Sequence, residues 1–536
     1  RSWPSAGPAF VADVHERTGG NPTFIRELFR YFEANPNVDA IPAAIQTVVI
    51  VGLQTLSVAC QQLLQRLSVL DHPFRPVDAE TIAGDAWHSG ALGKLVEHHY
   101  LRSEGGRYAF SNGIVRKSIY DSLLNHNKRV LHATAAELAA NDELPPVVRI
   151  RHLVRAERYA EAAVALSELR GRVVNTDRRL LEPIDAMLSH GRDMDDGLLG
   201  EVLYLRLAIL FNTHASDEDV AESIRQLLEL GIRTQRHELM GRAYAFLIGR
   251  HGRRGALHAA RHAGFQALRH YKLAKTNERT DSVSMLLATI CRRLGRLDES
   301  EQLIAGVENE SMRLSLAAEK AMMEHDLARA HASVKEALEA TAKDPPQIAS
   351  FGRAVRLGQL ARILIAGSAW RELLDLRADI EGVVGPWYGH QSMSYSGLAI
   401  AAHNLGLPAE ADAYLDRAAY FDRQSASEHF WYSAPLYLAL ARVELGRSSQ
   451  ASVDLEKIYV DLAEEPYEEA IVSTLELMLR ALGAGSPDRS LFYLVELEAL
   501  ITDMPITWDY DRMIVAWHRY TLAGVGASQS DSKERR

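Results

Sequence analysis

The feature that most constrains the fold is a long stretch of helical pattern that contains no strands. From about residue 131 to residue 523, apolar residues recur at helical spacing, Ala and Leu are abundant, and the turns are short. One compact core rarely organises a chain of this length. Helix pairs that stack into a solenoid avoid the problem, because each pair buries its apolar face against its neighbours. We therefore expect a predominantly all-α protein built around an α-solenoid.

Turn signals inside this stretch give its period. They lie at Gly295, His325, Gly367, Gly406 and Gly446. The steps between these positions are 30, 42, 39 and 40 residues, compared with a TPR period of about 34 residues. The spacing predicts degenerate, extended TPR-like helix pairs over residues 131–525. The concave groove of such an array would bind a protein partner or a small-molecule inducer.

The chain before this stretch has a different pattern. Ser57 is suited to cap a helix, and Leu101–Phe110 contains a glycine turn between two short runs of strand-forming residues. Asn112 precedes another amphipathic segment. Helices followed by a β-hairpin indicate a small winged-helix domain, which we assign to residues 37–130. Its helices are expected at 42–53, after Ser57, at 78–83, at 89–98 and at 113–124.

Two segments carry a resemblance to a known family. Residues 18–28, T-G-G-N-P-T-F-I-R-E-L, resemble the T-G-G-N-P-L-F-L-x-E-L motif that closes the ATPase module of STAND ATPases. Residues 108–120, Y-A-F-S-N-G-I-V-R-K-S-I-Y, resemble the F-x-F-S-H-A-L-V-R-E-A-L-Y motif of the same family, in the expected order. The chain is thus similar to the C-terminal part of bacterial STAND regulators, such as LuxR-type large regulators and adenylate-cyclase-linked relatives. Residues 1–36 would then be the end of an ATPase module, and residues 526–536 a disordered tail.

The resemblance also implies a nucleotide site. In the family the G-x-P element lies beside adenine, which places Gly20, Asn21 and Pro22 at the edge of such a site. Asn112 stands where many relatives carry a histidine that contacts the β-phosphate of ADP, and this departure puts nucleotide sensing at Asn112 in doubt. From the residues alone, Asn21 and Pro22 are equally a capped helix start.

The chain lacks the remaining parts of a nucleotide-hydrolysing site. It contains no G-x-x-x-x-G-K-[ST] phosphate loop. It also contains no H-E-x-x-H, G-x-S-x-G or Rossmann glycine pattern. We expect no enzyme activity, no metal and no cofactor in this chain. ATP or ADP would bind a longer protein, whose upstream ATPase module is an expected partner; the absence of an initiator Met before Arg1 predicts that upstream residues were removed.

Charge argues against general nucleic-acid binding, because the formal net charge is -10. One basic stretch stands out, since no acidic residue lies between Glu238 and Glu278. It could bind an anionic partner, or it could dock within the chain on acidic stretches such as 464–469. The candidate partner-binding residues are Arg250, Arg253, Arg254 and Arg261.

The environment of the chain is predicted from two further observations. No run of about 18 apolar residues occurs, so no membrane segment is expected. Only two cysteines are present, Cys60 and Cys291, which suits a reducing cytoplasm and two buried thiols.

The resemblance implies the sensor half of a signal-transduction ATPase that regulates transcription. The array would bind the inducer or partner, and the winged helix would couple that event to a nucleotide switch. One alternative is a free-standing TPR-like scaffold that never meets nucleotide. Another is a DNA-binding winged helix, which is disfavoured because Glu97 lies beside Lys94 in the helix before the hairpin.

Overall fold

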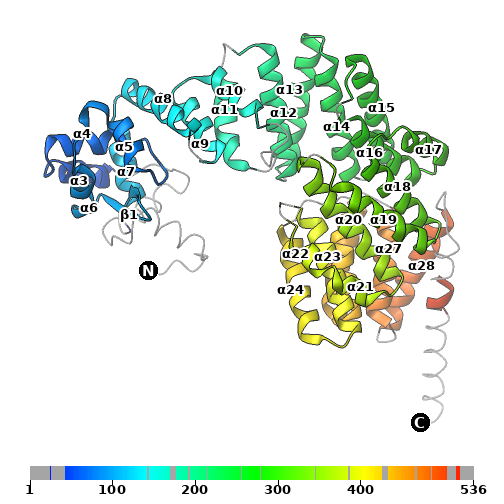
Figure 1. The fold of residues 1–536 in the computed structure, drawn as a ribbon. Helices are drawn as coiled ribbons and strands as arrows, with labels where there is room; N and C mark the ends of the chain where they lie inside the picture. Colours follow the sequence, from blue (N-terminus) through cyan, green and yellow to red (C-terminus); the bar gives the residue numbers. More distant parts are fainter. Residues whose placement is uncertain are drawn as a thin grey trace. The chain divides into compact units, whose positions relative to one another are not determined.

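The computed structural model describes most of the chain. The described residues are Ile25, 43–141, 144–169, 177–190, 194–213, 215–254, 256–277, 279–344, 346–383, Gly385, 387–424, 433–464, 468–483, 486–503 and 515–519. Within these ranges the chain is almost entirely helical, with a single two-stranded sheet (Figure 1). The expected class is confirmed: a predominantly all-α protein with a TPR-like solenoid and one small β-hairpin.

The chain divides into two compact units. The first comprises residues 1–170 and 179–202, and the second comprises residues 171–178 and 203–536. The division falls within α12 (Asp196–Asn212). The change of sequence pattern at residue 130 lies well before it.

From Ala43 onward, the first unit has short helices around one hairpin. Its elements are α3 (Ala43–Leu53), α4 (Val58–Leu67), α5 (Pro76–Ala83), the 3-10 turn η1 (Gly84–Ala86), α6 (Ala91–Glu97), β1 (Leu101–Glu104), β2 (Arg107–Phe110) and α7 (Gly113–Asp121). All the helices expected here are present. The Ser57 side chain caps α4 by accepting a hydrogen bond from the Cys60 N–H, as predicted. Cys60 itself is buried in the core of this region.

The hairpin is antiparallel, and Leu101 pairs with Phe110 while Glu104 pairs with Arg107. Gly105 and Gly106 form its turn, with φ angles of 58° and 78°. Two consecutive positive φ angles are the requirement of a type I′ turn, which explains the glycine pair. The unit continues with helices that follow the hairpin region: α8 (Asn125–Asn141), α9 (Pro146–Arg155), α10 (Tyr159–Ser167), the 3-10 turn η3 (Arg178–Leu180) and α11 (Leu181–His190).

The second unit is a succession of helices in which neighbours in the chain pack together. They are α13 (Asp217–Arg233), α14 (His237–Arg253), α15 (Leu257–Ala274), α16 (Thr280–Arg293), α17 (Leu297–Ala305), α18 (Glu310–Met323), α19 (Leu327–Thr341), α20 (Pro346–Ala366), α21 (Trp370–Asp375), α22 (Arg377–Glu381), α23 (Tyr388–Asn404), α24 (Pro408–Gln424), α25 (Ser433–Glu444), α26 (Ser448–Glu464), α27 (Glu468–Leu482) and α28 (Pro487–Asp503). Successive pairs contribute to shared apolar cores, and Leu398 on α23 lies at the centre of one of them with no exposed surface.

One turn geometry closes the first helix of successive pairs. The left-handed residues are Gly295, His325, Ser368, Gly406 and Gly446. In each case the next N–H donates to the carbonyl five residues earlier, as in Leu407 to Ala402 at 2.9 Å, which satisfies helix-end carbonyls. Each of the five predicted turns contains one of these left-handed residues. At the turn predicted from Gly367, the left-handed residue is the following one, Ser368, with a φ of 54°.

Packing between helix pairs generates a stability prediction. Replacing Leu398 by Ala should lower the free energy of unfolding by about 2–5 kcal/mol, because it removes buried methyl groups and leaves a cavity. The control is Val460→Ala on α26, whose side chain is 62% exposed. Urea denaturation followed by circular dichroism measures both. Equal effects of the two substitutions would contradict the assignment of Leu398 to the core.

Candidate functional site

A polar cluster lies inside the first unit, where the hairpin region meets the helices that follow it. Its side chains come from the loop after α4 and from α7, α8 and α9. We call it the Asp71 cluster. It consists of Asp71, His72, Arg116, Tyr120, His132, Arg151, His152 and Arg155.

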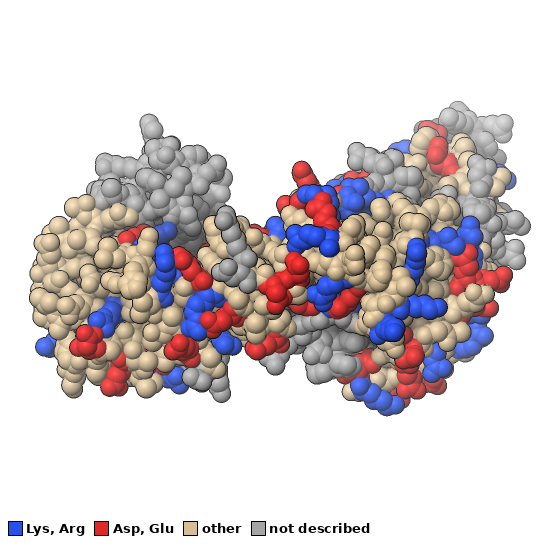
Figure 2. Space-filling view, turned by 90° about the horizontal axis from the view of Figure 1, so that it is seen from above, with Lys and Arg blue, Asp and Glu red and all other residues tan. Residues whose placement is uncertain are grey.

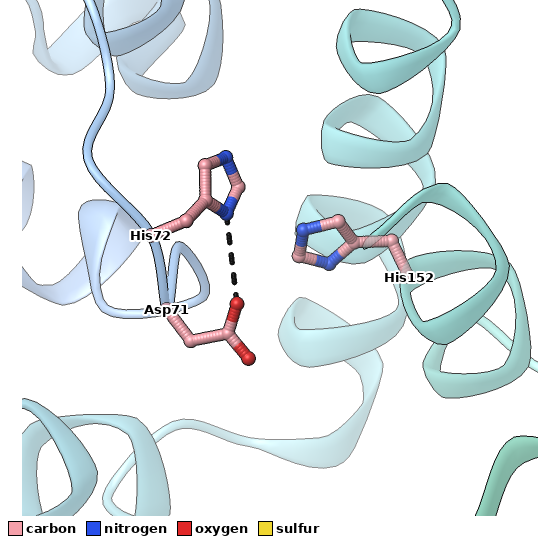
Figure 3. Close-up of side chains that lie close together, drawn as sticks. All are labelled: Asp71, His72 and His152. Atoms are coloured by element: carbon pink, nitrogen blue, oxygen red, sulfur yellow. Dashed lines mark ion pairs between the residues drawn. The ribbon is translucent and has the colours of Figure 1, made fainter. Parts of the chain in front are cut away.

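The loop that carries Asp71 and His72 is held in place at both ends. Leu70 N–H donates to the Leu67 carbonyl at 3.0 Å, which continues the end of α4. Phe74 exchanges two backbone hydrogen bonds with Tyr108 of β2, each 2.8 Å long, and its ring stacks on that of Tyr108. These contacts fix the loop between helix and hairpin. Asp71 and His72 consequently face His152 of α9 (Figure 3).

Asp71 binds two arginines of α9. One carboxylate oxygen pairs with Arg151 and lies 3.6 Å from Arg155, and the other lies 3.5 Å from His72 Nδ1. Burial would raise the pKa of Asp71, but the contact with His72 and the charges of Arg151 and Arg155 outweigh burial and hold the pKa well below 3.8. The carboxylate is therefore ionised at neutral pH. Its side chain is only 16% exposed, so this ion pair is shielded from solvent.

A chain of hydrogen-bonded rings runs from α7 into the same site. The Tyr120 hydroxyl lies 2.9 Å from His132 Nε2, and His132 Nδ1 lies 2.9 Å from His152 Nδ1. Both imidazoles are essentially inaccessible to solvent. Burial lowers the pKa of His132 and that of His152 to about 3, with neighbouring arginines contributing to the shift. Both histidines are therefore neutral at physiological pH.

Arg116 extends the cluster to the motif that carries the family resemblance. It lies in α7, and its guanidinium donates to the Ser68 carbonyl at 2.9 Å. Burial lowers the pKa of Arg116, whereas the charge of Asp71 raises it. The side chain thus ties α7 to the loop after α4, beside the Asp71 ion pair.

This arrangement ties the hairpin region to α8 and α9 through polar contacts. Removing one member of a buried polar network leaves its partners unsatisfied, which is costly. The cluster also brings potential metal ligands together, since ligand atoms of Asp71, His72 and His152 all lie within 4.8 Å of one another.

Asn112, the predicted nucleotide contact, has a structural role. Its Oδ1 accepts hydrogen bonds from Ile114 N–H at 2.8 Å and Val115 N–H at 3.2 Å, so it caps α7. The other predicted nucleotide contacts, Gly20, Asn21 and Pro22, lie outside the described residues, as do the end of the ATPase module around them and the tail at 526–536.

Three of the arginines predicted to bind a partner form ion pairs within the chain. Arg250 and Arg254 both donate to Asp217 at 2.6 Å, and Arg261 donates to Glu299 at 2.7 Å. These contacts agree with the intramolecular alternative, although the acidic residues are Asp217 and Glu299 rather than residues 464–469, whose side chains lie outside the described part. The Arg253 side chain is also outside it, and partner binding by these arginines stays a prediction.

Similar ion pairs join other neighbouring helices of the second unit. Examples are Arg480 with Glu444 at 2.7 Å and Arg417 with Glu381 at 3.2 Å. Figure 2 shows the result, with basic and acidic side chains interspersed on the face in view. Among the described residues on this face, the alternating signs leave no continuous cationic track for a phosphate backbone.

No local sequence motif singles out the Asp71 cluster. Sequence motifs for metal binding place histidines a few residues apart, whereas His72, His132 and His152 come from the loop after α4, from α8 and from α9. One weak signal exists, because His152 interrupts the apolar face of α9 between Val148 and the end of the helix.

Comparisons with known proteins add little. No family model matches the chain, and no curated protein is significantly similar to it. One similar solved structure is a Signal Transduction ATPase with Numerous Domains (STAND) protein with a tetratricopeptide repeat sensor, from Pyrococcus horikoshii. Its identity to the chain is 12%, its TM-score is 0.33, and the match covers 98% of this chain and 67% of that one. Among the described residues, no helix is long and apolar enough to cross a membrane.

The Asp71 ion pair generates a stability prediction. Asp71→Asn keeps the volume of the side chain but leaves Arg151 and Arg155 without a counter-charge, which should lower the free energy of unfolding by about 3 kcal/mol. The control is Asp85→Asn, whose carboxylate is 86% exposed and pairs with Arg66. It should change stability by less than about 0.5 kcal/mol. Urea denaturation measures the free energy of unfolding of both variants. A loss in D71N as small as that in the control would contradict the stabilising role of the Asp71 ion pair.

The buried histidine pair generates a pH prediction. The folded pKa of His132 and that of His152 are depressed from 6.5 to about 3, so their contribution to stability is complete above pH 6.5. As the pH falls from 6.5 toward 3, the unfolded chain takes up protons that the folded chain cannot. Stability should fall by up to about 1.4 kcal/mol per pH unit for each histidine. Across this range the denaturation midpoint of His132→Asn should fall less steeply with pH than that of the unaltered chain. The midpoint of His98→Asn, whose side chain is exposed, should fall as steeply as that of the unaltered chain.

Proposed function

We propose that this chain is the sensor and regulatory part of a STAND-type signal-transduction ATPase that controls transcription in the bacterial cytoplasm. The TPR-like array binds a protein partner or a small-molecule inducer. The hairpin region is a winged helix that couples this event to a nucleotide switch in an upstream ATPase module. The chain itself catalyses no reaction and does not read DNA.

The observation that carries the proposal is the position of the family-like segment 108–120 in the fold. It forms β2 and α7, and Arg116 within it reaches the loop that holds Asp71. Asp71 in turn pairs with Arg151 on α9. The segment that the resemblance assigns to nucleotide coupling is therefore joined, through polar contacts, to α9 at the start of the predicted array.

The order of elements supports the winged-helix assignment. The backbone bridge of Phe74 with Tyr108 adds a strand-like residue between α4 and α5, and α5 and α6 precede the hairpin. This order of helix, short strand, two helices and hairpin is that of a winged helix. The second helix of the pair, α6, presents Glu97 beside Lys94 on its exposed surface, which weakens attraction to phosphate.

Nucleotide binding by the native gene product, together with the proposed ATPase module, tests the proposal. Titration with fluorescent ADP should reveal a site, and partner binding at the array should change its affinity, with the reciprocal effect required by linkage. A folded native product that binds neither ATP nor ADP would instead favour the free-standing scaffold. Salt-sensitive retention of DNA by residues 37–130 would favour the DNA-binding alternative.

The coupling itself can be separated from binding. Asp71→Asn in the native product should reduce the partner-induced change in ADP affinity, which for such systems is about 5-fold to 150-fold. It should leave the affinity of the array for its partner within about 2-fold when measured without nucleotide. Asp85→Asn is the matched control. Coupling that is unchanged in D71N would contradict a role of the Asp71 cluster in transmission.

A further inference from the structure

We propose that Asp71, His72 and His152 form a binding site for one divalent transition-metal ion, with Zn²⁺ as its natural occupant. The site is independent of the proposed nucleotide switch. It joins the loop after α4 to α9, and its ligands would be one carboxylate oxygen and two imidazole nitrogens.

The first support is the position of the donor atoms. The ligand atoms of the three side chains lie within 4.8 Å of one another. Ligands at the usual zinc distances are about 3.4 Å apart when arranged tetrahedrally, so small rotations of His72 and Asp71 would bring them to bonding distance. His152 extends from α9 toward the other two residues (Figure 3). Three protein ligands leave one coordination position for water.

The second support is the His152 Nε2 atom, which is buried without a hydrogen-bond partner among the described residues. The His152 side chain is 1% exposed. A buried polar atom that lacks a partner is unusual and calls for a water or an ion. His72 Nδ1, the other imidazole atom of the site, has the Asp71 carboxylate as its neighbour at 3.5 Å.

The third support is the chain of rings behind His152. A metal-bound imidazole usually donates its other N–H to an acceptor that fixes its orientation. His152 Nδ1 lies 2.9 Å from His132 Nδ1, and His132 Nε2 lies 2.9 Å from the Tyr120 hydroxyl. With the proton on His152 Nδ1 donated to His132, the lone pair of Nε2 points toward Asp71 and His72. His132 is thus a positioning residue for the proposed site.

The surrounding charge selects among metal ions. The site carries an excess of positive charge, because the single carboxylate of Asp71 faces three arginines, Arg116, Arg151 and Arg155. This positive charge repels any cation. Arg151 and Arg155 face one oxygen of Asp71 and leave the other toward His72. Mg²⁺ and Ca²⁺ depend on several oxygen ligands, so this repulsion excludes them. Zn²⁺ and Co²⁺ gain bond energy from imidazole nitrogen, which offsets the repulsion.

Cobalt titration of the full chain tests the site, because Co²⁺ in a histidine and carboxylate site gives visible d–d absorption. One equivalent should bind, Zn²⁺ should displace it, and Mg²⁺ or Ca²⁺ should not. His72→Gln should weaken Co²⁺ binding by at least about 10-fold, and His132→Asn by about 10-fold to 100-fold. His72 lies on a loop and is partly exposed, so its variant is expected to fold; His152→Asn is the second ligand variant.

The matched control is His98→Ala with His126→Ala, which removes two exposed histidines of the same unit. It should leave the Co²⁺ affinity unchanged, while circular dichroism verifies the fold of every variant. Absence of a stoichiometric Co²⁺ complex in the unaltered chain would overturn the proposal. So would a complex that survives both His72→Gln and His152→Asn, or one that is lost only in the control, since either result places the metal on surface histidines.

Discussion

A helix pair buries one apolar face between its own two helices and leaves the other face in need of a neighbour. Each pair in this chain meets that need by stacking on the next, which is why Leu398 is fully buried although it lies in a single helix of a long array. The turns must then be short and uniform, and left-handed residues such as Gly406 provide that geometry. Ion pairs between neighbouring helices add directional contacts on the surface of the stack.

The Asp71 cluster joins the small hairpin region to the helices that follow it. An apolar contact alone would permit sliding, whereas a buried carboxylate between Arg151 and Arg155 has few satisfactory arrangements. Neutral His132 and His152 extend this constraint to α7 through Tyr120. The junction is therefore specific, because removing any one of these groups leaves buried polar partners unsatisfied.

Much of the fold was predictable from local patterns. Alternation and a glycine pair located the hairpin, and periodic apolar residues with turn signals located the array. In the turn predicted at 366–368 the left-handed residue is Ser368, although the neighbouring Gly367 is the better sequence signal for that conformation. The candidate site was not predictable, since Asp71 and His152 are 81 residues apart and meet only after α4, the hairpin and α9 have packed. The basic stretch was visible in the sequence, but its acidic partners lie on helices outside it, at Asp217 and Glu299.

Hydrogen exchange tests the central claim that the Asp71 cluster holds the hairpin region to the helices that follow. Amide protection should be compared between the unaltered chain and Asp71→Asn, resolved along the sequence by mass spectrometry. The account predicts that protection falls in the loop at 68–74, in α7 and in α9, and that α16 to α28 are unchanged. A loss of protection spread evenly over the chain, or no loss in α7 and α9, would contradict it.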